Sequence, residues 1–152
     1  PYLSRGLGDV YKRQSLINPE IGAAGDVDTA VVTMIYADGK IAVIKNSRRA
    51  AYGYDQRIEI LGSEGLLQAE NIVENSVVKS TEAGVLSAKP KYFFLERYMS
   101  AYKAEWDAFI KSLKENTTVP VTLEDGVAAL AMAEAATLSQ SSGKSIQLTE
   151  VL

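Results

Sequence analysis

The hydrophobic residues follow two patterns along the chain, and short runs of β-branched and aromatic residues dominate its first half. Residues 29–36 and 40–45 are rich in β-branched and aromatic side chains and flank an Asp38-Gly39 pair, a combination that predicts a β-hairpin. More short apolar segments follow, separated by turn residues; they are residues 56–61, 66–69, 76–80 and 85–87. Consecutive strands joined by short turns pair antiparallel, so the pattern predicts an antiparallel meander.

The same pattern predicts how far each strand is covered. Apolar residues occupy both faces of residues 29–45, which indicates that both faces are partly buried. In residues 56–61, Ile58 and Ile60 alternate with Arg57 and Glu59, which indicates one face in water.

From residue 92 onward the hydrophobic period lengthens to that of a helix. Apolar side chains recur every three or four positions over residues 92–113, which predicts an amphipathic helix; they are Leu95, Tyr98, Tyr102, Trp106, Phe109 and Leu113. An alanine-rich helix is predicted from Thr122, as N-cap, to Gly143, as C-cap, and residues 145–148 favour a short strand. Strands followed by helices indicate an α+β fold, with an open, mainly antiparallel sheet and the helices on one face.

Composition removes several classes of site. The 152 residues include no cysteine and no histidine, which excludes disulfides, thiolate metal sites and the commonest general base near neutral pH. The acidic residues are scattered, so we expect no metal site. The 16 basic and 19 acidic residues give a net charge of −3 without forming runs, which favours neither nucleic acid nor a membrane as partner. No apolar stretch reaches the roughly 18 residues of a spanning helix, and we expect a cytoplasmic location.

The first fourteen residues do not share the pattern of the rest. They read PYLSRGLGDVYKRQ, and the part SRGLGDVYKRQ resembles translated sequencing-adaptor peptides. Gly6 and Gly8 lack the preceding strand, the third glycine and the following helix of a dinucleotide-binding loop. We therefore expect residues 1–14 to be non-native and residues 15–152 to be a single domain, a fragment whose upstream part is missing.

One polar segment holds candidate chemistry. Residues 46–57, NSRRAAYGYDQR, gather two tyrosines and three arginines around Gly53, and loops of this kind on a rigid sheet often hold ligands. A rim tyrosine with paired charges is the structural alternative. Tyr98 and Tyr102 follow the spacing of the helix, and packing with the hydroxyl at the rim accounts for both without a ligand.

Residues 15–152 resemble the C-terminal domain of the inositol 2-dehydrogenases, which belong with glucose–fructose oxidoreductase to one superfamily of nicotinamide-dependent sugar oxidoreductases. The resemblance rests on the order of four segments, GDVDTAVVTMIYADGKIAVIK, NSRRAAYGYDQRIEILGSEG, FFLERYMSAYKAEWDAFIKSL and VPVTLEDGVAALAMAEAATLSQSSGKSIQL. The second segment is the specific one, because the order of strands and helices is common to the whole superfamily.

The resemblance implies that this chain is one half of a longer enzyme, and that the other half binds the cofactor and carries the catalytic residues. An N-terminal Rossmann half would hold NAD and supply the Lys of an E-K-P motif and the Asp and His of a D-x-x-x-H motif. This sequence contains neither motif, so we expect no catalytic, cofactor-binding or metal-binding residue in this chain and no activity from the chain alone. The family also packs its exposed sheet face against other subunits, which implies a homo-oligomer such as a tetramer.

The resemblance also places substrate residues. Tyr54, in YGYD, and Tyr102, in SAYKAE, match positions that reach the polyol, and we expect them to lie near one another. A tyrosine offers both a hydroxyl partner and an aromatic wall to a ring of this kind. Arg48 or Arg49 would add donors, and the sequence does not decide which.

The function implied is that of the substrate-binding half of an NAD-dependent inositol 2-dehydrogenase, which oxidises a ring hydroxyl of a cyclic polyol to a ketone. Two alternatives stay open. One is a related NAD(P)-dependent dehydrogenase for another sugar or polyol. The other is a noncatalytic carbohydrate-binding or scaffold module of the same fold.

Overall fold

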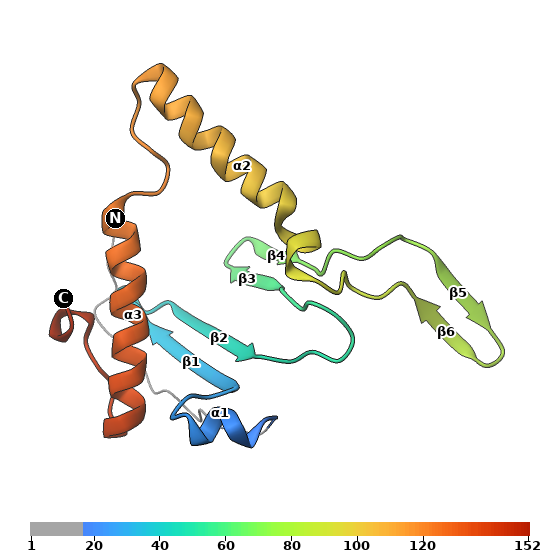
Figure 1. The fold of residues 1–152 in the computed structure, drawn as a ribbon, viewed down its shortest axis with the longest axis horizontal. Coiled ribbons are helices and arrows are strands. Elements are labelled where there is room, and N and C mark those ends of the chain that lie inside the picture. The colour runs from blue at the N-terminus through green and yellow to red at the C-terminus, as the bar shows by residue number, and fades with distance from the viewer. Residues whose placement is uncertain (1–16) are drawn as a thin grey trace. The chain divides into compact units, whose positions relative to one another are not determined.

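Residues 17–152 are described by the computed structural model, and they divide into two units (Figure 1). Unit 1 combines residues 17–49 with residues 120–152, and unit 2 is the continuous stretch 50–119. The segment 1–14, which the sequence analysis predicts to be non-native, lies outside the described residues.

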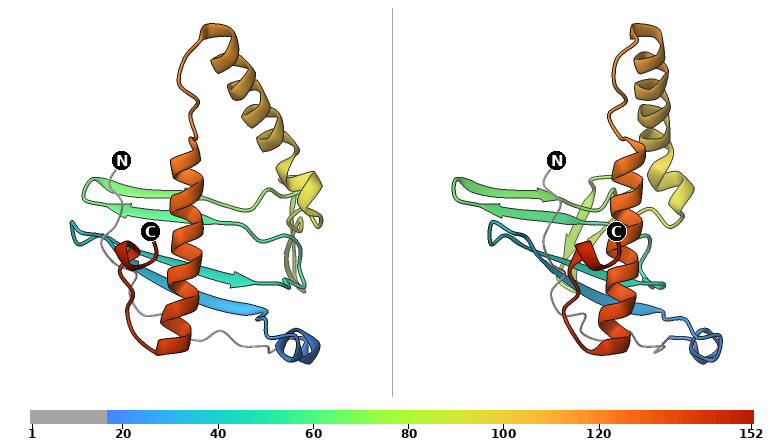
Figure 2. Two further views of the ribbon diagram at one scale, coloured as in Figure 1. Left: turned by 60° about the vertical axis from the view of Figure 1, so that its left-hand side comes forward. Right: turned by 90° about the vertical axis from the view of Figure 1, so that its left-hand side faces the viewer.

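Unit 1 packs one helix against one hairpin. Its elements are α1 (Pro19–Ala23), β1 (Thr29–Ile35), β2 (Ile41–Ser47), α3 (Leu123–Ser142) and the short 3-10 helix η1 (Leu148–Glu150). β1 and β2 pair antiparallel, from Thr29 opposite Ser47 to Ile35 opposite Ile41. The helix α3 crosses one side of this hairpin (Figure 2).

The core of unit 1 lies under α3. Its buried members are Met34 of β1, Ala131 and Ala135 of α3, and Leu148 of η1. Alanine has no side chain beyond Cβ, which lets α3 lie close to η1, and Ala135 is completely buried. The alanine-rich composition of residues 123–142 thus allows α3 to contribute to the core with small side chains.

The boundaries of the long helices follow the predicted caps. The Thr122 hydroxyl accepts a hydrogen bond from the Asp125 amide at 3.3 Å, and Gly143 closes α3 in the left-handed conformation at φ 67°. The helix α2 (Phe94–Glu115) ends at Asn116, also left-handed at φ 51°. Both helices and both caps of α3 are therefore confirmed, and α2 lies within two residues of the predicted range 92–113 at each end.

Unit 2 consists of two hairpins and α2. Its strands are β3 (Ile58–Gly62), β4 (Gly65–Ala69), β5 (Val78–Thr81) and β6 (Gly84–Ser87). β3 pairs with β4 and β5 with β6, both antiparallel. The segments that lead into and out of β5–β6 are also held together, by an antiparallel bridge between Val73 and Pro90.

The α+β class and the antiparallel pairing are confirmed, and the structure adds detail that the pattern lacked. Within residues 17–152 the six strands pair as three two-stranded sheets. Of the strand expected over residues 145–148, only Ile146 is in a β-bridge; the chain then turns into η1, which places Leu148 in the core. The helix α1 was not expected, because Asn18-Pro19 reads equally as a turn.

The predicted burial of the strands is confirmed for β1 and wrong for β2 and β3. The residues of β1 are half-buried or buried, except for Ile35. Every residue of β3 and β4 is exposed, as are all residues of β2 except Ala42. From the alternation of residues 56–61 and the apolar composition of residues 40–45 we predicted that another element buries the apolar side chains of these strands. No other element of the same unit does so. Covering a strand takes a second layer, which the local pattern does not specify.

Candidate functional site

Three aromatic rings form a continuous row in unit 2, which we call the tyrosine row: Tyr54, Tyr98 and Tyr102. The rings of Tyr54 and Tyr98 meet edge to face with centroids 5.6 Å apart, and those of Tyr98 and Tyr102 are 5.9 Å apart. Tyr98 and Tyr102 lie one turn apart on α2, so they share one face of the helix. The guanidinium of Arg97 stands 5.7 Å from the Tyr98 centroid, within cation–π range.

A close backbone approach places the loop that carries Tyr54. The Tyr54 amide donates to the Lys91 carbonyl at 2.8 Å, and the Lys91 amide donates to the Ile72 carbonyl at 3.0 Å. Gly53 adopts φ 141°, and a Cβ added there would lie 2.7 Å from the Pro90 carbonyl oxygen. Only glycine fits this contact without displacing the backbone.

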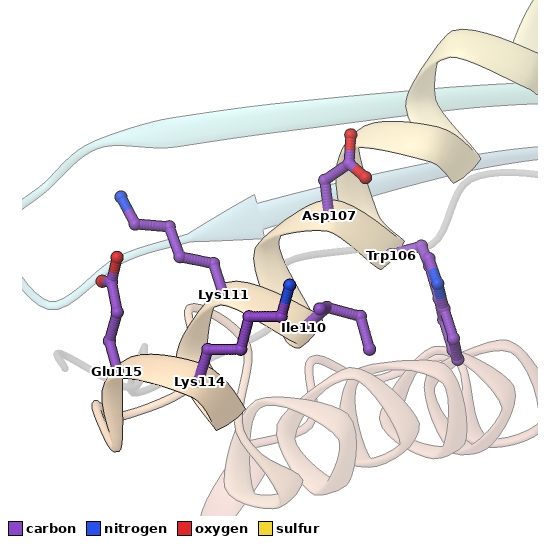
Figure 3. Close-up of a pocket in the computed structure, with 6 residues that line it drawn as sticks. All are labelled: Trp106, Asp107, Ile110, Lys111, Lys114 and Glu115. Atoms are coloured by element: carbon purple, nitrogen blue, oxygen red, sulfur yellow. The ribbon is translucent and has the colours of Figure 1, made fainter.

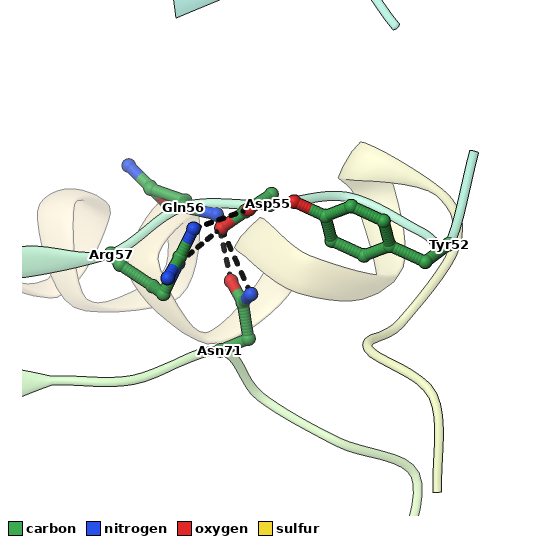
Figure 4. Close-up of polar contacts among 5 residues, drawn as sticks. All are labelled: Tyr52, Asp55, Gln56, Arg57 and Asn71. Carbon is green, nitrogen blue, oxygen red and sulfur yellow. Dashed lines mark hydrogen bonds and ion pairs between the residues drawn. The ribbon is translucent and has the colours of Figure 1, made fainter. Parts of the chain in front are cut away.

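A polar cluster centred on Asp55 lies next to Tyr54 in the chain (Figure 4). Arg57 grips its carboxylate with two donors, Nε to Oδ1 at 2.7 Å and a terminal nitrogen to Oδ2 at 2.8 Å. Asn71 donates to Oδ1 at 2.9 Å, and the Tyr52 hydroxyl donates to Oδ2. Asn71 also accepts from the Gln56 amide at 2.8 Å. We call Tyr52, Asp55, Arg57 and Asn71 the Asp55 cluster.

The electrostatics of these groups follow from their contacts. The Arg57 guanidinium, followed by the Tyr52 hydroxyl, holds the pKa of Asp55 well below its usual range, so Asp55 is an anion at neutral pH. The same contact raises the pKa of Tyr52, because the phenol proton is shared with a carboxylate. The pKa of Tyr98 is also raised, first by a side-chain hydrogen bond with Tyr54 and then by desolvation. The phenols of Tyr52 and Tyr98 are therefore protonated under physiological conditions.

The two arginines left open by the sequence lie in unit 1. The Arg48 guanidinium pairs with Asp26 at 2.6 Å and donates from Nε to the Val27 carbonyl at 3.2 Å, so it ties the end of β2 to the segment before β1. The Arg49 amide donates to the Ser47 hydroxyl at 3.4 Å. The contacts of Arg48 thus give this side chain a structural role within unit 1.

A shallow hollow of about 390 Å³ runs along the C-terminal half of α2 (Figure 3). All of its lining residues belong to this one helix; they are Trp106, Asp107, Ile110, Lys111, Lys114 and Glu115. Ligand sites bury most of their ligand between several elements, and one helix face does not do so. We therefore place the candidate site at the tyrosine row.

Neither a metal site nor a membrane-spanning helix occurs in the described part of the chain. Carboxylates are the strong metal ligands that this chain possesses, because it has no histidine and no cysteine. Within residues 17–152, no three of them lie close enough together to hold a metal ion. Among the helices of the same residues, none combines the length and the apolar composition needed to cross a membrane.

The structure places the predicted site residues and adds one that the sequence did not single out. Tyr54 and Tyr102, which we expect to lie near one another, belong to one row, and the ring that connects them is Tyr98, which the helical spacing indicated as a packing residue. Asp55 and Arg57 stand two positions apart, which puts them on one side of an extended segment, so their pairing had a sequence signal. The contacts with Asn71 and Pro90 had none, because they depend on how distant segments meet.

Comparison with known proteins gives consistent matches. Residues 7–148 match the family model described as "Oxidoreductase family, C-terminal alpha/beta domain". The chain is 47% identical over 137 residues to the myo-inositol 2-dehydrogenase of Thermotoga maritima, and this alignment covers 90% of the chain and 41% of that protein. The chain therefore spans less than half the length of this relative.

Solved structures show the same likeness. The crystal structure of a myo-inositol dehydrogenase from Corynebacterium glutamicum superposes with a TM-score of 0.86 at 37% identity, over 93% of this chain and 43% of that one. The scyllo-inositol dehydrogenase of Lactobacillus casei, solved with bound NAD(H) and scyllo-inositol, has a TM-score of 0.82 at 27% identity, over 97% of this chain and 43% of that one.

Proposed function

Because this chain belongs to the oxidoreductase family as its C-terminal alpha/beta domain, we propose that it is the substrate-binding half of an NAD-dependent inositol 2-dehydrogenase. The intact enzyme would oxidise one ring hydroxyl of a cyclic polyol to a ketone. The names of the relatives and the inositol in the Lactobacillus casei complex support this substrate class.

The observation that carries the proposal is the tyrosine row. A cyclic polyol has hydroxyls around its edge and apolar C–H groups on its ring faces, so it needs hydrogen-bond partners and a flat apolar wall together. Each phenol supplies one of each. Tyr102 keeps 45% of its surface exposed, so the row is accessible to a ligand. Tyr54 and Tyr102 are the substrate contacts in this proposal, and Tyr98 holds the rings at their spacing.

The described residues, 17–152, do not fit the cofactor. A dinucleotide is held by a glycine-rich loop between a strand and a helix, whereas Gly39, Gly65 and Gly84 stand at the turns of the three β-hairpins. In our proposal NAD and the proton-transferring groups belong to the other half of the enzyme. The 152-residue chain by itself should accordingly be inactive.

The first prediction tests the pocket in the full-length enzyme that carries this domain. Tyr54→Phe removes one hydroxyl partner, worth about 0.5–1.5 kcal/mol, and should lower kcat/KM for inositol about 2- to 10-fold. The KM for NAD should stay unchanged. Steady-state kinetics with each substrate varied in turn provide the measurement, and Tyr92→Phe, at a side chain 75% exposed, is the matched control.

The outcomes separate cleanly. Equal kinetics for Tyr54→Phe and Tyr92→Phe with every polyol tried would remove the substrate pocket from this domain. A loss with another sugar but none with inositol would retain the pocket and favour a related sugar dehydrogenase.

A further inference from the structure

We infer that Asp55 is a positioning residue for the reaction, one that holds Tyr54 against the substrate without touching the substrate itself. The inference rests on the proposed function, because it gives Tyr54 a role in binding the polyol. It gives a role to the Asp55 cluster, whose contacts the tyrosine row alone does not explain.

Asp55 has no acceptor capacity left for a ligand. An ionised carboxylate offers about four lone-pair directions, and four donor groups already occupy them. Oδ1 accepts from Arg57 and Asn71, and Oδ2 accepts from Arg57 and Tyr52. The carboxylate side chain also keeps only 17% of its surface exposed. A direct hydrogen bond to a polyol would have to displace one of these donors.

The contacts on both sides of Tyr54 form a closed frame. On one side, Gly53 lies against Pro90 and the Tyr54 amide is bound to Lys91. On the other side, Asp55 is bound to Asn71. The two anchoring segments are joined to each other, because the Lys91 amide donates to the carbonyl of Ile72, the neighbour of Asn71 in the chain. The frame therefore fixes the backbone of Tyr54 on both sides.

The side chains of Tyr54 and Asp55 have different partners: one contacts the helix α2, and the other anchors the loop. The Tyr54 ring meets Tyr98 of α2, whereas the Asp55 carboxylate meets Asn71. Loss of the Asp55 contacts would free one side of the loop and leave the Tyr98 contact as the main constraint on the Tyr54 ring. A substrate would then have to order this ring on binding, at a cost in apparent affinity.

The contact with Arg57 makes the frame rigid. A guanidinium that holds a carboxylate with two parallel donors is stronger and more directional than a single neutral hydrogen bond. Arg57 lies two residues beyond Asp55, so the pair also fixes the chain as it enters β3 (Ile58–Gly62). The orientation of Tyr54 is thereby tied to the hairpin β3–β4.

The test is a double-mutant cycle in the full-length enzyme, because two residues that act through one another are non-additive. Asp55→Asn removes the charge and keeps the shape, and it should lower kcat/KM for inositol about 3- to 10-fold, through a higher KM, with the KM for NAD unchanged. In the Tyr54→Ala background, which lacks both the hydroxyl and the ring that Asp55 would position, the same substitution should change kcat/KM less than about 1.5-fold. Asp107→Asn, which breaks the exposed pair with Lys103 on α2, is the matched control.

A second variant covers the case in which Asp55→Asn does not fold. Arg57→Lys keeps the cation and removes the two-donor grip, at a side chain 58% exposed, and it should show a smaller loss with the same dependence on Tyr54. Equal losses in both backgrounds, for either variant, would overturn the positioning role and leave the proposed function intact. If Tyr54→Phe alone has no effect, the proposed function fails first.

Discussion

At the scale of single residues, the site depends on a position where no side chain fits. Gly53 meets two independent constraints, a φ of 141° and the Pro90 carbonyl oxygen at 2.7 Å from any added Cβ. The first constraint disfavours every L-residue, and the second one disfavours even a methyl group. The position of Tyr54 therefore depends on Gly53, which allows the backbone to approach Pro90, as well as on the contacts of the tyrosine ring.

The chain offers a matched comparison that separates these constraints. Gly84 adopts φ 136° in the β5–β6 turn and has open space around it. Alanine at either position strains the backbone, which lowers the free energy of unfolding by about 1–3 kcal/mol. Alanine at Gly53 must also displace the Pro90 segment. Gly53→Ala should therefore lower the free energy of unfolding of unit 2 by about 1–3 kcal/mol more than Gly84→Ala does. Urea denaturation of the two variants provides the measurement, and equal midpoints would contradict the close approach.

At the scale of elements, the two long helices differ in how their ends are secured. α3 begins with a reciprocal capping box, in which Thr122 accepts from the Asp125 amide and Asp125 accepts from the Thr122 amide. α2 has Phe93 at its N-cap, without a side-chain hydrogen bond. α3 is thus fixed by local contacts and by its core alanines, whereas the start of α2 depends on the rings it carries.

The capping box yields a stability prediction. Thr122→Ala removes the hydroxyl that accepts from the Asp125 amide and leaves this amide without its partner, which should cost about 0.5–2 kcal/mol. Thr137→Ala, in the middle of the same helix, removes only a hydroxyl bonded to the Ala133 carbonyl and should stay within about 0.5 kcal/mol of the parent. Thermal unfolding of both variants makes the comparison.

The effect of Thr122→Ala should also depend on pH. Hydrogen bonds from the Thr122 amide and hydroxyl lower the pKa of Asp125. A lowered folded-state pKa adds stability above the ordinary carboxyl value and loses it as the pH falls. The difference between parent and Thr122→Ala should therefore shrink below about pH 4; a difference that is constant down to pH 2 would speak against the box.

At the scale of the whole molecule, the strands leave much apolar surface uncovered. In unit 2, Leu67 of β4 is 70% exposed and Ile60, which faces it across the hairpin on β3, is 56% exposed. In unit 1, Ile41 of β2 is 67% exposed. Isolated proteins seldom expose large contiguous apolar patches unless another surface covers them. We propose that the strands form the contact between copies of the chain in a homo-oligomer.

Sedimentation of the full-length enzyme should accordingly report an oligomer at micromolar concentration. Leu67→Lys places a charge on the proposed contact and should shift the distribution toward smaller species. Val121→Lys, in the loop before α3 and 73% exposed, is the control with the same change in chemistry. A monomeric parent enzyme, or identical shifts for the two variants, would rule out the strands as the contact.

The sequence alone determined the features that depend on neighbours in the chain. The β-branched and aromatic composition of residues 29–45 around Asp38-Gly39 specifies β1 and β2, and the three-to-four spacing from Leu95 to Leu113 specifies α2. Thr122 and Gly143 mark the ends of α3, since a cap acts within one turn of its helix. The specific segment around Tyr54 also supported the resemblance to the family that the comparisons confirm.

Tertiary structure alone decided which of these residues meet. Tyr98 became the link in the tyrosine row because α2 turns that face toward the loop, and Asn71 reached Asp55 because two segments 16 positions apart lie side by side. The exposure of β3 and β4 was likewise hidden from the pattern. Periodicity reports which side of an element is apolar, but the partner of that side is chosen by long-range packing, which no local spacing encodes.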